Sequence, residues 1–144
     1  MTTPLPSQRV FFDSSAFIKR YVAESGSQQV ILICETASEI CLSAIAVPEI
    51  ISAFCRLNRE GKISKPQYHQ LKKSFMDDIA DVALADVSPD VLSHAVVRLE
   101  VSALRGMDAI HIATALVLKA DLFVSADSQQ LAAARLSRLE VAAI

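Results

Sequence analysis

The stretch RVFFDSSAF, residues 9–17, places one acid between an apolar run and a pair of serines. Arg9 to Phe12 is predicted to form a buried strand, and Ser14-Ser15 is predicted to cap a helix from Ala16 to Ala23. Asp13 would then stand just past the carboxyl end of that strand. In open parallel sheets this edge is where ligands bind. The stretch therefore indicates an α/β fold and the place of its site.

Outward from this stretch, predicted strands and helices alternate along the chain. Further strands are expected at residues 39–43, 82–87, 121–125 and 141–144. Helices are expected at residues 45–60, 107–119 and 128–139 and after Ser27, Ser64 and Ser88. The alternation predicts a single domain over residues 1–144, with a short N-terminal tail at 1–8. Its fold class is expected to be a three-layer α/β/α sandwich with a mainly parallel central sheet.

The composition is apolar and the net charge is small. With 144 residues, 52% of them hydrophobic, the chain can bury its own core, and its apolar surplus favours an oligomer. No apolar run approaches the ~20 residues of a membrane span, and residues 1–7 lack the features of a signal peptide. A cytoplasmic protein without membrane contact is therefore expected. The three cysteines lack C-x-x-C spacing and are interpreted as buried, reduced thiols.

Four acids, Asp13, Glu49, Asp108 and Asp127, stand at predicted strand ends or helix starts. If they converge to within ~5 Å, each pair of like charges costs about 3 kcal/mol at an effective dielectric of ~20. Such a cluster takes up protons or binds cations, and its oxygen ligands favour one or two Mg²⁺ or Mn²⁺ ions over zinc. Taken singly, each acid also has a structural interpretation. Asp108 and Glu49 suit the first turn of a helix, whereas Asp13 and Asp127 suit turns or caps.

Four local segments carry a resemblance to a known family. They are FDSSAFIKRY (12–21, with Glu24 and Gly26-Ser27), SAIAVPE (43–49), LRGMDAIHIATA (104–115) and FVSAD (123–127). In this order and spacing they resemble the acidic motifs of the PIN-domain ribonucleases, especially the VapC-like toxins of bacterial toxin–antitoxin pairs. The resemblance covers essentially Val10 to Ile144.

The resemblance implies roles for particular residues. Asp13, Glu49, Asp108 and Asp127 would be the catalytic, metal-binding carboxylates, with Ser15 and Ser125 in support. Each serine also has a plain interpretation as a cap of the next helix or turn. The implied activity is Mg²⁺- or Mn²⁺-dependent endonucleolytic hydrolysis of RNA that leaves 5′-phosphate and 3′-hydroxyl ends. The implied partners are a small cognate antitoxin and a second copy of the chain, in a homodimer.

Other residues and other functions remain open at this stage. His111 shares a helical face with Asp108, and a packed or hydrogen-bonded histidine is the favoured interpretation. Among the basic residues, Lys19, Arg20, Arg56, Arg59 and Lys62 suit either RNA phosphates or a solvated helix surface, which is favoured. A net charge of −2 argues against a protein that coats RNA, but not against a metal-dependent nuclease. The alternatives are a non-catalytic module that binds RNA or a partner protein, and a free-standing RNA processing nuclease.

Overall fold

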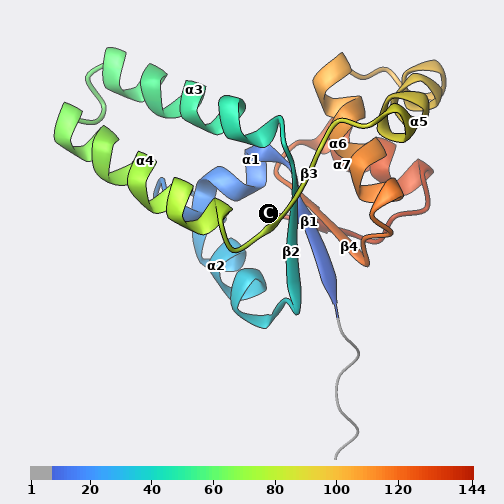
Figure 1. The fold of residues 1–144 in the computed structure, drawn as a ribbon, viewed down its shortest axis with the longest axis horizontal. Coiled ribbons are helices and arrows are strands. Elements are labelled where there is room, and N and C mark those ends of the chain that lie inside the picture. The colour runs from blue at the N-terminus through green and yellow to red at the C-terminus, as the bar shows by residue number, and fades with distance from the viewer. Residues whose placement is uncertain (1–7) are drawn as a thin grey trace, which may run out of the picture.

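The structure is a computed structural model that describes residues 8–144. Its strands form one parallel sheet in the order β3-β2-β1-β4-β5. The strands are β1 (Arg9–Phe12), β2 (Glu39–Ser43), β3 (Ala83–Ala85), β4 (Leu122–Ser125) and β5 (Val141–Ala143). The helices are α1 (Ser14–Phe17), the 3₁₀ turn η1 (Ile18–Arg20), α2 (Ser27–Thr36), α3 (Ala46–Arg59), α4 (Lys65–Ile79), α5 (Pro89–Val101), α6 (Gly106–Val117) and α7 (Ser128–Leu136). Figure 1 shows α1 to α4 on one side of the strands and α5 to α7 on the other.

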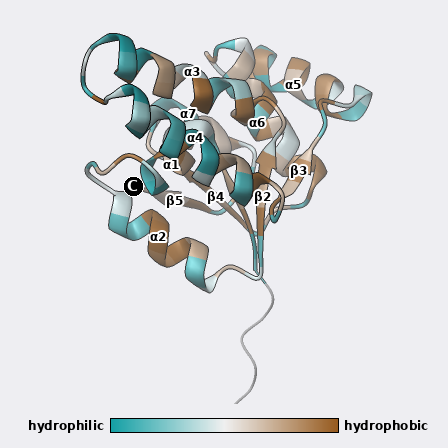
Figure 2. Cartoon of the chain, turned by 60° about the vertical axis from the view of Figure 1, so that its left-hand side comes forward, coloured by the Kyte–Doolittle hydropathy of each residue, from teal (hydrophilic) through white to brown (hydrophobic). Residues whose placement is uncertain are grey.

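The core lies on both faces of the sheet, because successive side chains of a strand point to opposite sides. Val10 and Phe12 of β1 pack into one cluster with residues of α1, α2, α3 and α4. Phe11, between them, packs with residues of α6 and α7 on the other face, and α5 covers the outer side of α6. Figure 2 shows hydrophobic colour along the strands and more hydrophilic turns on the outer parts of α3 and α4. These layers confirm the predicted α/β/α sandwich.

The strand order places β1 in the middle of the sheet, between β2 and β4. The chain leaves β1 toward β2 and β3 on one side, and β4 and β5 complete the other side. In open α/β sheets, ligands bind outside the carboxyl ends of the strands where the order reverses in this way. The end of β1, followed directly by Asp13, lies at that point.

The predicted helix from Ala16 to Ala23 was wrong at both ends. α1 begins at Ser14 because the carboxylate of Asp13 accepts the backbone N–H of Ala16 at 3.0 Å and caps the helix. The helix tightens into η1 and ends at Arg20. The serines predicted as the cap are therefore helical residues, and their hydroxyls are available for other contacts.

Other boundaries differ by a few residues. Gly106, expected to break the chain, is the first residue of α6, and α7 ends at Leu136 instead of residue 139. Most of the predicted tail, residues 1–7, lies outside the described residues, while the backbone N–H of Gln8 donates to Ser38 Oγ at 3.1 Å. Among residues 8–144 no helix combines the length and the apolar character that a membrane crossing requires. Cys41 is buried and Cys34 and Cys55 are half-buried, all as free thiols.

Candidate active site

Asp13 lies at the carboxyl end of β1 and is almost completely buried, at 4% exposure. Ser15 Oγ donates a hydrogen bond to its Oδ1 at 2.7 Å, and Ser125 Oγ donates to its Oδ2 at 2.6 Å. Burial raises the pKa of this carboxyl, although the two hydroxyls and the Ala16 N–H stabilise the charged form and act in the opposite direction. Asp13 is therefore a carboxyl that gains from a nearby cation.

The two serines that hold Asp13 also organise the end of β4. Ser125 Oγ accepts the backbone N–H of Asp127 at 3.0 Å, and Ser15 Oγ accepts that of Ala126 at 3.1 Å. Both serines therefore contact Asp13 directly. Each hydroxyl is both a donor to the carboxylate and an acceptor for the turn that leads to Asp127, which agrees with the structural interpretation of these serines. Their role in supporting a metal ligand stays a prediction.

Glu49 lies in the first turn of α3 and is about one-third exposed, at 35% of its side chain. Ser14 Oγ donates to its Oε1 at 2.8 Å, and His111 Nε2 lies 2.7 Å from the same oxygen. Burial is the largest single influence on the Glu49 pKa and raises it. The hydrogen bonds from His111 and Ser14 together outweigh burial, so the pKa of Glu49 is lowered.

Asp108 and Asp127 approach the same edge from α6 and α7. Burial raises the pKa of Asp108, and the charge of Asp127 raises it further, with smaller contributions from Asp13 and Glu49. The side chain of Asp127 caps α7 by accepting the N–H groups of Gln129 at 2.8 Å and Gln130 at 3.1 Å. Three of the acids therefore act electrostatically on the fourth, Asp108, and each of the four also has the capping or first-turn place that the sequence allowed.

The side chains of the four acids are not arranged to coordinate a metal ion together. Within residues 8–144, no group of three or more His, Cys, Asp or Glu side chains is positioned to hold a metal ion. The reason is visible in the contacts, since Asp13, Glu49 and Asp127 are each turned toward hydrogen-bond donors of the protein. The carboxylate oxygens are still suitable ligands for a hard divalent cation, because each carboxylate has about four lone-pair sites and can bind a cation as well as a hydrogen-bond donor. A shared metal site stays a prediction for these four acids.

Two contacting residues were not foreseen. Ser14 was interpreted only as part of a helix cap, yet its hydroxyl binds Glu49. Gln130, which is buried, donates from Nε2 to the backbone oxygen of Asp108 at 3.1 Å and so ties α7 to α6. The burial of a long polar residue in a helix rich in alanine has no sequence signal beyond its position three residues after Asp127. His111 is buried and hydrogen-bonded, as expected.

A parallel α/β sandwich with acids at the carboxyl edge of its sheet is found in a broad class of proteins. Comparison of the sequence with known families identifies the family within this class. The chain matches the PIN domain family over residues 10–136, and it belongs to that family. Ribonuclease VapC45 of Mycobacterium tuberculosis (strain CDC 1551 / Oshkosh) is 28% identical to it over 109 residues, which are 76% of each protein.

Solved structures share the fold at low sequence identity. The crystal structure of Mycobacterium tuberculosis VapC20, described as a sarcin-ricin loop cleaving toxin, matches with a TM-score of 0.64 and 16% identity, over 86% of this chain and 94% of that one. A toxin-antitoxin complex from Klebsiella pneumoniae matches with a TM-score of 0.66 and 15% identity, over 85% and 90%. At these identities the likeness establishes the fold alone.

Proposed function

We propose that this protein is a metal-dependent endoribonuclease and the toxin of a toxin–antitoxin pair. The observation that carries the proposal is a PIN-domain sheet with Asp13 directly after β1 and Asp127 just after β4 at its carboxyl edge. Asp127, Asp13 and Glu49 add to burial in raising the pKa of Asp108, which supports a shared acidic site. The relative named Ribonuclease VapC45 supports the reaction class.

Asp13, Glu49, Asp108 and Asp127 would hold the cation, Mg²⁺ or Mn²⁺, as one ion or two. When bound, it supplies Lewis-acid polarisation of the phosphate and an activated water. Ser15 and Ser125 fix the buried carboxylate of Asp13 from both of its oxygens. Burial is the main cause that raises the pKa of Asp108, and a cation would relieve the repulsion from neighbouring acids that raises it further. The products expected are a 5′-phosphate and a 3′-hydroxyl end.

A small cavity suggests how RNA approaches these acids. It has a volume of about 270 Å³ and is bounded by Ser14, Ser15 and Glu49 at one end and by Ser52 and Arg56 further along α3. Arg56 stands two helical turns after Glu49, about 10 Å along the axis. A guanidinium at that distance can reach a phosphate next to the scissile one. One guanidinium group can bind two oxygens of a phosphate at the same time. Arg56 is proposed to bind the RNA backbone there.

The antitoxin is proposed to be a small protein that covers the acidic edge with a basic side chain. Two features support it. Glu49 is partly open and Asp127 is exposed, so a cation of a partner can reach them. The fold is also that of the toxin-antitoxin complex from Klebsiella pneumoniae.

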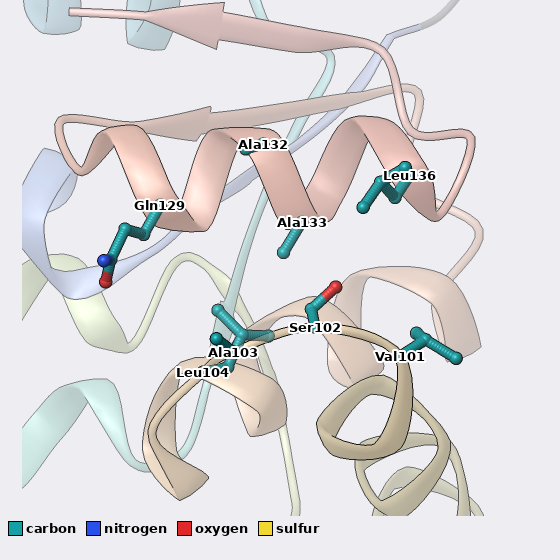
Figure 3. A pocket seen from close by; sticks show the side chains of 8 residues that line it. All are labelled: Val101, Ser102, Ala103, Leu104, Gln129, Ala132, Ala133 and Leu136. Carbon is teal, nitrogen blue, oxygen red and sulfur yellow. The ribbon is translucent and has the colours of Figure 1, made fainter.

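A homodimer is proposed through the apolar outer face of α5 and the adjoining end of α7. The hydrophobic side chains of α5 and α7 that are more than 40% exposed are Leu92, Val96, Val97, Leu99, Val101 and Leu136. Figure 3 shows the pocket beside them, with a volume of about 320 Å³, between α7 and the segment that follows α5. Several exposed hydrophobic side chains gathered on one helix and its neighbour are typical of a protein–protein contact. A second copy would cover it.

The experiment that tests the proposal compares cleavage and binding of RNA by the wild-type protein and Asp108→Asn. The nuclease proposal expects cleavage in Mg²⁺ or Mn²⁺ that EDTA and Asp108→Asn both abolish, with RNA binding retained. A non-catalytic binding module would instead bind RNA without cleaving it, and Asp108→Asn would change nothing. A free-standing processing nuclease would cleave RNA but would have no antitoxin that inhibits it.

A further inference from the structure

The polar imidazole ring of His111 is buried among apolar side chains. His111 is on α6, one turn after Asp108, and its side chain is 2% exposed. Its neighbours on the same helix, Ile112 and Ala115, belong to the core on this face of the sheet. Phe11 of β1 meets its ring edge-on, with the centroids 6.2 Å apart. A buried polar ring among apolar groups is unfavourable unless it is hydrogen-bonded.

The hydrogen bonding of His111 is directed at one oxygen of the acidic site. Nε2 lies 2.7 Å from Glu49 Oε1, while Nδ1 is buried and has no hydrogen-bond partner within residues 8–144. A carboxylate only accepts hydrogen bonds, so the hydrogen of this contact belongs to Nε2. The absence of a partner at Nδ1 among the described residues agrees with this assignment. An Nδ1 that carried hydrogen would need an acceptor, whereas an unprotonated Nδ1 does not.

A second donor, on α1, reaches the same oxygen. Ser14 Oγ donates to Glu49 Oε1 at 2.8 Å and lies 3.4 Å from His111 Nε2. Both donors thus converge on Oε1, and Oε2 of Glu49 accepts no protein hydrogen bond within residues 8–144. Two donors on one oxygen fix the rotation of the carboxylate and leave the other oxygen available.

We propose that His111 is a positioning residue, which with Ser14 holds Oε1 of Glu49 so that Oε2 is presented to the divalent cation. The inference rests on the proposed metal-dependent function and assigns to α6 a second contribution to the site besides Asp108. Groups that hydrogen-bond a metal ligand from behind typically change metal affinity by 10- to 100-fold when they are removed.

The test uses a matched pair of substitutions and a readout that needs no catalysis. A glutamine amide can reach the position of Nε2, whereas the shorter asparagine reaches only that of Nδ1. Binding of Mn²⁺ to the purified full chain without RNA is followed from the electron paramagnetic resonance signal of the free ion. His111→Gln is expected to bind Mn²⁺ within about threefold of wild type, and His111→Asn at least ~10-fold more weakly. Equal affinities for the two variants would overturn the proposal.

Two further measurements test the proposal even if a variant at this buried position fails to fold. Nitrogen-15 resonances of histidine in the wild-type protein report which ring nitrogen carries hydrogen, and a bare Nε2 would overturn the proposal. Ser14→Ala, at a half-buried position, is expected to weaken Mn²⁺ binding by about threefold, and unchanged binding would count against it. Wild-type protein that binds no Mn²⁺ at all would overturn the proposed function as well, which distinguishes the two failures.

Discussion

Ser125 Oγ lies 2.6 Å from Oδ2 of Asp13 and joins the carboxyl end of β4 to that of β1. The contact is completely buried on the serine side. It places a neutral donor against the most buried acid of the site and stabilises its charged form. The position of the Asp13 carboxylate is therefore set by two adjacent strands of the sheet.

Removing this donor should reduce both stability and activity. Ser125→Ala is expected to lower the free energy of unfolding by about 2 kcal/mol, because a hydrogen bond to a charged group is lost in the interior. RNA cleavage is expected to fall by about 10-fold as Asp13 loses its orientation. Chemical denaturation and initial cleavage rates measure the two effects. The exposed Ser74→Ala on α4 is the control and should change neither; an unaffected Ser125→Ala would contradict the account of Asp13.

The pKa shifts predict opposite pH dependences for two acids when no divalent ion is present. The pKa of Asp108 is raised, so its contribution to stability is present at low pH and is lost as the pH rises from its unfolded value through the raised folded one. The pKa of Glu49 is lowered, so its contribution is present above its unfolded pKa and is lost as the pH falls through the lowered folded value.

The sign of the Asp108 effect can be measured with one substitution. Asp108→Asn in EDTA is expected to gain stability relative to wild type as the pH rises from 4 to 7, by about 1 kcal/mol after allowance for solvent screening. Urea denaturation across this range gives the difference directly. A difference that shrinks with rising pH would show that burial and the neighbouring acids do not raise the pKa of Asp108. Saturating Mg²⁺ should remove the advantage of the variant.

Arg56 should affect RNA binding more than the chemical step. Arg56→Ala is expected to raise KM for RNA several-fold with kcat nearly unchanged, and to reduce the slope of log affinity against log salt by about 1. Arg59→Ala, on the same helix but outside the cavity beside Glu49, is the matched control. If both variants behave alike, the phosphate contact at Arg56 is wrong.

The apolar face of α5 and α7 should govern self-association. A charge at an exposed position of this face, Leu136→Glu, is expected to convert a dimer to a monomer, because an unpaired charge in an apolar contact is strongly unfavourable. Light scattering with size-exclusion chromatography measures the change. Ile31→Glu on α2, also at an exposed apolar position, should leave the mass unchanged. A monomeric wild-type protein would rule out the proposed dimer.

The sequence predicted the layers of the fold well, because apolar runs such as Val10–Phe12 and helix starts such as Ser88-Pro89 are local signals. It also predicted that Asp13 and Asp127 follow the ends of strands, because both come just after an apolar run. The contact of His111 with Glu49 was not predictable, because it depends on how α6 is rotated against the sheet and how near the first turn of α3 lies. Side-chain rotamers set by tertiary hydrogen bonds also decided that the acids face protein donors.

The four acids are proposed to form a metal-dependent ribonuclease site. The most direct test incubates the purified protein with total cellular RNA in Mg²⁺ or Mn²⁺ and maps new 5′-phosphate ends by sequencing, beside an EDTA control and Asp13→Asn. The account predicts discrete cuts that both controls abolish. Cuts that persist in Asp13→Asn would contradict the proposed site. The same holds if the folded protein, free of any partner, binds the metal ion but cleaves no RNA.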